Sequence, residues 1–148
     1  MPAKRRIAPG KNEAHPAGEA MGYIIQLENG FKIWHMGDTG LFPDMQFISA
    51  HYKPDLVLIP IGGNFTMDPK DAAFAARTWI NPKNIIPIHY NSNPNAKGTL
   101  AEFQAAMHGS SIKVTPITEG RTVEFWGLCI VPAQAISVSR QILGAVSA

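Results

Sequence analysis

The sequence predicts an α/β fold built on a mixed β-sheet. Short, buried-looking strand runs alternate with helix-like segments between Asp38 and Met107, a hairpin signal precedes them, and further strand-like runs follow. This alternation is typical of a layered α/β domain. The length of 148 residues is that of one domain, and contents of 45% apolar and 16% charged residues indicate a globular protein.

The segments at the start of the chain differ from one another in composition and in the spacing of their apolar residues. Residues 1–21 are rich in Pro, Gly, Ala and charge with no apolar period, which predicts a loop or a flexible arm. From Gly22 onward, GYIIQLE and FKIWHM are β-type runs separated by Asn29-Gly30, a strong two-residue hairpin signal. After GDTG, the segment LFPDMQFISAHY spaces its apolar residues as a helix does.

The remaining elements follow in order. LVLIPIGG reads as a fully buried strand, and PKDAAFAARTWI as a helix with Pro69 at its start. NIIPIHY is a second buried strand. GTLAEFQAAM is a short helix in which Thr99 and Glu102 form a capping box, and SIKVTPI and RTVEFW are two final strands.

Charge and cysteine content exclude several classes of protein. The formal net charge of +2 is too small to favour nucleic acid or a membrane surface as a partner. A single cysteine, Cys129, excludes an intrachain disulfide framework and fits a reducing cytoplasm. The basic N-terminus has no apolar run behind it, and polar residues interrupt the tail, so neither a secretory signal nor a membrane span is expected. A cytoplasmic location is the prediction.

Candidate functional residues follow three predicted strands, in HMGDTG, PIGGNFTM and PIHYNSN. In α/β sheets, functional loops gather beyond the carboxyl ends of the strands. Asp38 and His89 would meet there, beside a glycine-rich loop that offers Asn64 and Thr66. A carboxylate and an imidazole together form part of a divalent metal site.

Each residue alone has a simpler interpretation. Asp38 could cap the helix expected near Leu41, and His89 could be a hydrogen-bonded structural histidine. A structural zinc site needs about four protein ligands and a catalytic one about three. Strand alternation assigns His35 to the face opposite Asp38. His51 lies late in a helix and His108 follows another, whereas His15 could reach the site from the N-terminal arm. The chain contains no HxHxDH cluster.

Three ordered motifs carry a resemblance to a known family. FKIWHMGDTGLFPDM, LVLIPIGGNFTMDPKDAA and IIPIHY resemble the C-terminal half of metallo-β-lactamase-superfamily hydrolases, in the branch related to ascorbate-6-phosphate lactonase. The resemblance implies that Asp38 bridges two metal ions, zinc ahead of manganese, and that His89 ligates the second. It also implies that Asn64 and Thr66 border a small-molecule substrate. His15 is an additional candidate ligand.

The chain departs from this family in two respects. There, the HxHxDH motif and a further ligand histidine precede the hairpin, in an N-terminal half that this chain lacks. The family fold is an αββα sandwich of two similar halves, of which this chain would supply one sheet with helices on one face. The predicted division is therefore an arm (1–21), a C-terminal half-domain (22–125) and a tail outside the family (126–148), as expected of a truncated or rearranged gene.

A half-sandwich would expose the sheet face that normally packs on the other half, which predicts that something covers it. The tail could do so, and otherwise a homo-oligomer or a partner chain is expected. The apolar residues that the tail offers are Leu128, Ile130, Val131, Ile136, Val138, Ile142 and Leu143.

These observations support a metal-dependent hydrolase in which metal-activated water attacks a lactone, amide or phosphoester, with Asp38 as the catalytic residue. The main alternative is a catalytically incomplete half-domain that acts as a scaffold or assembles with another chain. A symmetric dimer could also share one site built from Asp38, His89 and His15. A nucleotide-binding protein is disfavoured, because neither glycine-rich turn is a GxGxxG or a P-loop.

Overall fold

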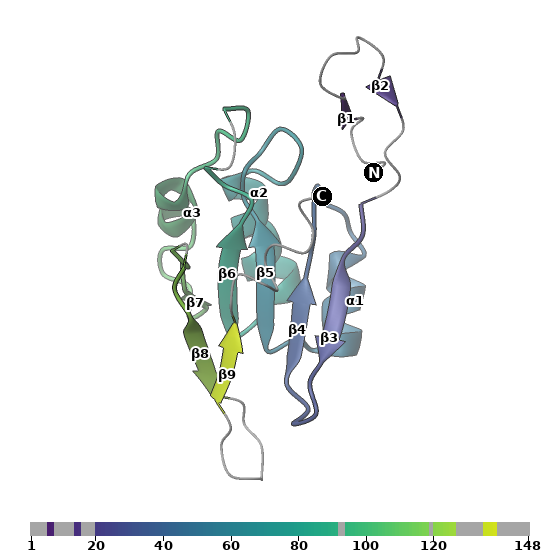
Figure 1. Cartoon of the computed structure of the whole chain (residues 1–148), viewed down its shortest axis with the longest axis vertical. Helices are drawn as coiled ribbons and strands as arrows, with labels where there is room; N and C mark the ends of the chain where they lie inside the picture. The colour runs from purple at the N-terminus through teal and green to yellow at the C-terminus, as the bar shows by residue number, and fades with distance from the viewer. Residues whose placement is uncertain are drawn as a thin grey trace.

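A five-stranded mixed sheet forms the centre of the molecule (Figure 1). The computed structural model describes residues 6–7, 14–15, 20–91, 94–118, 120–126 and 135–138. Antiparallel β3 pairs with β4, and the remaining neighbours pair in parallel, in the order β3-β4-β5-β6-β7. These strands are β3 (Tyr23–Gln26), β4 (Lys32–His35), β5 (Leu56–Pro60), β6 (Asn84–Ile88) and β7 (Lys113–Val114). The predicted α/β class and mixed sheet are confirmed.

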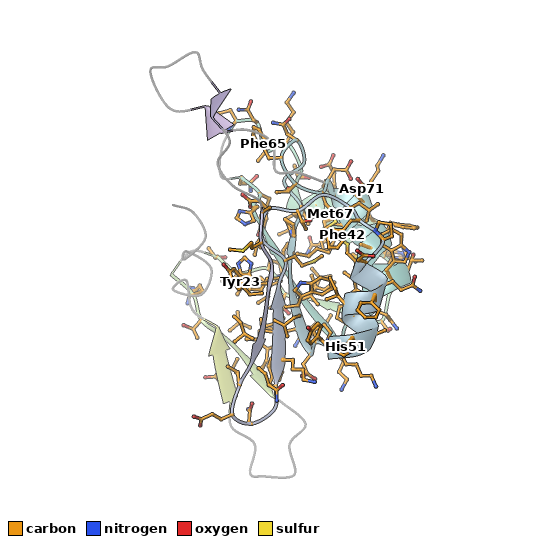
Figure 2. All side chains as sticks on the ribbon, turned by 90° about the vertical axis from the view of Figure 1, so that its right-hand side faces the viewer. Tyr23, Phe42, His51, Phe65, Met67 and Asp71 are labelled. Atoms are coloured by element: carbon orange, nitrogen blue, oxygen red, sulfur yellow. The ribbon has the colours of Figure 1, made fainter. Side chains whose placement is uncertain are left out.

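The helices α1 (Met45–Tyr52), α2 (Pro69–Phe74) and α3 (Leu100–Ala106) all cover one face of this sheet. Helix α2 continues into one π-helical segment, η1 (Ala75–Ile80). Met45, Ala72 and Phe103, one from each α-helix, share a single buried cluster with the sheet. Figure 2 shows Phe42, Met67 and His51 on this helical side. No helix in the described ranges is long and apolar enough to cross a membrane.

Local sequence signals explain where two helices begin. The Asp68 carboxylate accepts the backbone N–H groups of Lys70 and Asp71, both at 2.8 Å, and Pro69 takes the first helical position. At α3 the predicted capping box is present, with Thr99 and Glu102 each accepting the other's backbone N–H. Both devices satisfy N–H groups that a helix end leaves unpaired.

The hairpin between β3 and β4 forms where Asn29-Gly30 predicted it, but its turn is longer than two residues. Leu27 and Phe31 still pair, through a backbone bond of 2.9 Å, and Gly30 takes the positive φ of 83°. The Asn29 side chain accepts the Phe31 N–H at 3.0 Å. One positive φ, supplied by glycine, fits a three-residue hairpin loop.

Alternation along β5 divides the core into two clusters. Val57 and Ile59 face the helices, whereas Leu56 and Leu58 face the other side, and all four are fully buried. A strand buried on both faces needs an unbroken apolar run, which LVLIP supplies.

The face opposite the helices is covered in part by residues that follow β7. Phe125, 5% exposed, packs there with Val123 and Ile117. Phe125 belongs to β8 (Val123–Trp126), which pairs in antiparallel fashion with β9 (Ala135–Val138).

The expectation that the tail covers this face falls largely outside the described residues. Ile136 and Val138 are described only as backbone in β9, and the other apolar tail residues lie outside the described ranges. In the arm, β1 (Arg6–Ile7) and β2 (Ala14–His15) form a small antiparallel pair where the composition predicted a loop.

Candidate metal centre

Asp38 and His89 meet at the carboxyl-terminal edge of the sheet. The His89 Nε2 atom lies 3.0 Å from Asp38 Oδ1, although the two residues are 51 positions apart in the chain. Asp38 retains 44% exposure and His89 20%. The predicted convergence of these two strand ends is therefore a feature of the structure.

A glycine turn places Asp38. Strand β4 ends at His35, and Gly37 then takes φ 66°, a conformation that costs residues with a Cβ about 1–2 kcal/mol. A Cβ at Gly37 would also clash with the carbonyl oxygen of Met21. The alternative that Asp38 caps the following helix is wrong, because α1 begins only at Met45, with Asp44 as its N-cap.

His89 itself adopts the unusual backbone conformation at the end of β6. Its φ is 55°, in the left-handed region that side chains other than glycine rarely adopt. The preceding Ile88 carbonyl accepts the Ile61 N–H at 3.1 Å, and the His89 carbonyl packs directly on Gly62, where a Cβ would clash. Backbone strain held by close packing is common at functional sites.

The turn that contains Asn64 and Thr66 lies between β5 and α2 and contacts both strand ends. The Met67 N–H donates to the Thr39 carbonyl at 2.9 Å, which ties this turn to the residue after Asp38. The Thr66 hydroxyl donates to the Met67 carbonyl at 3.2 Å. Asn64 is exposed at φ 56°. The turn thus borders the Asp38–His89 contact, and the substrate roles of Asn64 and Thr66 stay predictions.

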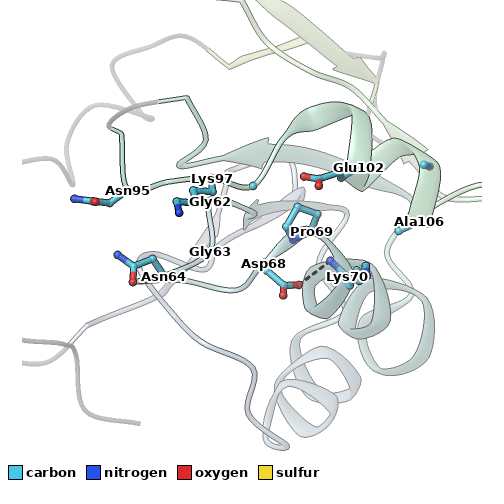
Figure 3. Close-up of a pocket in the computed structure, with 12 residues that line it drawn as sticks. Gly62, Gly63, Asn64, Asp68, Pro69, Lys70, Asn95, Lys97, Glu102 and Ala106 are labelled. Carbon is cyan, nitrogen blue, oxygen red and sulfur yellow. Dashed lines mark hydrogen bonds between the residues drawn. The ribbon is translucent and has the colours of Figure 1, made fainter.

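The same turn lines a hollow of about 830 Å³ (Figure 3). Gly62 and Asn64 line it together with Lys97 and the start of α3, whereas Asp38, His89 and Thr66 do not. Its two carboxylates, Asp68 and Glu102, are held by the helix caps described above. The hollow is therefore a neighbour of the Asp38–His89 contact rather than its floor.

His35 lies close enough to Asp38 and His89 for their charges to act on its imidazole. The imidazole is 3% exposed. Strand geometry ends at His35, and the positive φ of Gly37 reverses the chain before Asp38. Counting alternate residues across that glycine therefore does not determine how far His35 lies from Asp38. A histidine just before a glycine turn with a candidate ligand was the signal available in the sequence.

Burial disfavours the charged form of His35. Desolvation lowers the pKa of its imidazole from the ordinary 6.5, and the neighbouring His89 lowers it further, while Asp38 and a backbone hydrogen bond act in the opposite direction. Separately from that bond to its own backbone, His35 Nδ1 accepts the Gly37 N–H at 3.1 Å. The Nε2 atom is buried and has no hydrogen-bond partner within the described ranges.

The other histidines lie elsewhere or are not described. His51 stacks on Phe47 and meets the edge of Tyr52, on the outer surface of α1. His108 is exposed after α3. The backbone of His15 pairs with Arg6 in the small β1–β2 sheet, and its side chain is outside the described part.

The residues present fit two positions of a metal centre. His89 Nε2 is buried and makes no hydrogen bond to any described residue, even though the Asp38 oxygen is close. A nitrogen and a carboxylate oxygen that approach without hydrogen-bond alignment are arranged as two ligands of one cation would be. In the described ranges, no group of three or more His, Cys, Asp or Glu side chains is placed to hold a metal ion.

The fold and the site together define a layered α/β protein with an Asp–His pair at the carboxyl ends of its strands. Residues 4–89, more than half of the chain, match the family described as "Beta-lactamase superfamily domain". The chain belongs to this superfamily.

The relatives carry a common description. A "UPF0173 metal-dependent hydrolase" from Polynucleobacter asymbioticus is 78% identical over 118 residues, which are 80% of this chain and 41% of the relative. One from Polaromonas sp. is 58% identical over 116 residues, 78% of this chain and 42% of the relative. The chain thus spans about two fifths of the length of these curated relatives.

Solved structures agree with the fold. A metallo hydrolase from Ignicoccus hospitalis superposes with a TM-score of 0.63 at 31% identity, over 88% of this chain and 51% of that one. An isothiocyanate hydrolase from Delia radicum gut bacteria has the same TM-score at 21% identity, over 73% and 45% of the two chains. The second likeness concerns the fold alone.

Proposed function

We propose that this chain contributes the Asp38–His89 portion of a metal-dependent hydrolase site. The observation that carries the proposal is the 3.0 Å approach of His89 Nε2 to Asp38 Oδ1 at the carboxyl ends of β4 and β6. Its support comes also from the relatives described as metal-dependent hydrolases.

Asp38 and His89 would hold a divalent metal, zinc ahead of manganese, because imidazole nitrogen with carboxylate oxygen suits zinc well. Such a metal polarises a substrate oxygen and lowers the pKa of bound water towards neutrality. In this arrangement the Asp38 carboxylate is the catalytic group of the chain. The strand ends hold the backbones of both residues close together before substrate arrives, which lowers the cost of ordering the site.

The substrate proposed for this site is a small molecule with a hydrolysable lactone, amide or phosphoester group. Asn64 and Thr66 would border it, since their turn is tied to Thr39 and packs on His89. A soluble substrate of the cytoplasm fits the single cysteine and low net charge of the chain.

Metal content of the purified protein, measured by plasma mass spectrometry after dialysis against zinc or manganese, tests the proposal. We expect at least about one equivalent of zinc, lost in both Asp38→Ala and His89→Ala, because each removes a direct ligand. His108→Ala, which changes an exposed histidine elsewhere, is the matched control and should keep its metal. Retention of zinc by either site variant would contradict the proposal.

The second candidate function is assembly with another chain that completes the site. Within the described ranges only two donors converge, whereas a catalytic zinc takes about three protein ligands. The missing ligands would come from His15, from a second copy of the chain, or from a partner that supplies an HxHxDH cluster. Sedimentation velocity with and without zinc distinguishes these sources: a zinc-dependent dimer with one metal per two chains supports a shared site, and a zinc-loaded monomer contradicts assembly.

A further inference from the structure

His35 presents a buried hydrogen-bond donor that nothing in the described ranges accepts. The side chain is 3% exposed, its Nδ1 accepts the Gly37 N–H at 3.1 Å, and its Nε2 makes no hydrogen bond there. Leaving a buried donor unpaired is unfavourable and rare in folded proteins, so its persistence calls for an explanation.

The hydrogen bond to Nδ1 determines which nitrogen of His35 carries the proton. Nδ1 must offer its lone pair to the Gly37 N–H, so the neutral ring carries its proton on Nε2. A histidine that ligates a metal through Nε2 needs a lone pair on that atom and usually donates Nδ1–H to a second group. His35 has the opposite arrangement and is therefore a donor rather than a metal ligand.

We propose that His35 is a positioning residue that donates its Nε2–H to the Asp38 carboxylate when the site holds its metal. The acceptor has to lie within the protein, because an atom buried this deeply is closed to a substrate entering from solvent. Asp38 is the carboxylate whose charge acts on the His35 ring. One carboxylate oxygen would then face the metal and the other His35.

The role of this contact would be to fix the orientation of Asp38. A carboxylate ligand can rotate about its side-chain bonds, and a hydrogen bond from a second residue restricts it to the rotamer that binds. Asp38 is 44% exposed, so packing alone restrains it little, whereas His35 is held by the core and by Gly37. The inference rests on the proposed function, because it needs Asp38 to be a ligand.

Two substitutions at one position separate the donor from the rest of the histidine. In His35→Asn the side-chain oxygen can still accept the Gly37 N–H, but no donor reaches the Nε2 position. In His35→Gln the longer side chain carries an amide N–H close to that position. Zinc affinity is measured on the wild-type chain and both variants by competition with a chromophoric chelator, and circular dichroism checks that each is folded.

We expect His35→Asn to bind zinc about ten- to a hundredfold more weakly than wild type, and His35→Gln to stay within about threefold of it. The imidazole ¹⁵N spectrum of the metal-free chain should show the Nε2–H tautomer, and zinc should leave that proton in place. Equal zinc affinity in all three folded proteins would overturn the inference, and so would an Nε2 resonance that shifts to the position of a metal-bound nitrogen.

The failure of the proposed function has a different signature. A wild-type chain that binds no zinc contradicts the Asp38–His89 metal site itself. The metal-free spectrum then decides about His35 alone: an Nε2–H tautomer supports a buried donor, and an Nδ1–H tautomer overturns it.

Discussion

The turns that position Asp38 and His89 both contain a residue in the left-handed backbone conformation, but at different places relative to the candidate ligand. After β4, Gly37 takes the left-handed conformation at φ 66°, and Asp38 follows in an ordinary one. After β6, His89 takes it, at φ 55°, and the glycine that makes room, Gly62, lies on the neighbouring strand end. The left-handed backbone conformation is therefore taken by the residue before Asp38 in one turn and by His89 itself in the other.

The two candidate ligands also differ in how their side chains are restrained. The backbone of His89 is held by Gly62 packing and its ring is 20% exposed, so its position is determined by the core. The Asp38 side chain, 44% exposed, depends on neighbouring groups for its orientation. Substitutions at the glycines should therefore disturb folding, and substitutions around Asp38 should disturb metal binding.

The largest expected effect comes from filling the space that these glycines leave. Gly62→Ala and Gly37→Ala place a Cβ against the carbonyl oxygens of His89 and Met21, respectively. Backbone atoms cannot move aside cheaply, so each change should lower the free energy of unfolding by about 3 kcal/mol. Urea denaturation measures this.

Gly109→Ala is the control for conformational strain without a clash. Gly109 has φ 76° and no atom near the position of a Cβ, so a loss of about 1 kcal/mol is expected. If Gly62→Ala cost no more than this control, Gly62 would not be what holds His89.

Low pH should reduce the free energy of unfolding through His35, which lies at the end of β4, just before the turn to Asp38. Its pKa in the folded chain lies below the 6.5 expected when unfolded, because burial disfavours the charged ring. Unfolded chains therefore take up the proton first, and stability falls as the pH drops below about 6.5, by at most about 1.4 kcal/mol per pH unit.

Urea midpoints between pH 7.5 and pH 5, with a chelator present, measure this loss. His35→Gln has no group that titrates in this range at the position, so its stability should depend less steeply on pH than that of the wild type. Parallel curves for the two proteins would contradict a buried neutral His35.

The smallest expected effect is the difference in stability between glycine and alanine substitutions at each of the two candidate ligands. His89→Gly should be about 1 kcal/mol more stable than His89→Ala, because only alanine is strained at φ 55°. At Asp38 the order should reverse, since glycine there adds only freedom to the unfolded chain. The same order at both positions, in thermal or urea unfolding, would remove the distinction between the two turns.

Most of the fold could be predicted from local sequence patterns. The unbroken apolar runs of β5 and β6, Pro69 at a helix start and the Thr99–Glu102 capping box each specify an element through a short-range physical cause. The two-residue strands β1 and β2 lacked such a signal. The length of the β3–β4 turn depended on a single positive φ at Gly30, which the dipeptide Asn29-Gly30 does not determine alone.

Only the site residues that directly follow parallel strands could be predicted from the sequence. Asp38 and His89 were identified because parallel strands bring their carboxyl ends to one edge. His35 was missed because its position depends on how Gly37 bends the chain, which residue counting does not capture. The hollow beside Asn64 is lined by three separate segments of the chain, so no single sequence motif predicts it.

Anomalous scattering at the zinc edge, from crystals grown with zinc, tests the Asp38–His89 metal centre most directly. The account predicts a peak about 2.0–2.2 Å from both an Asp38 carboxylate oxygen and His89 Nε2. His35 should lie behind Asp38 and outside the metal's direct ligands. A zinc-containing crystal with no peak between Asp38 and His89, or with zinc bound at His51 or His108 instead, would contradict it.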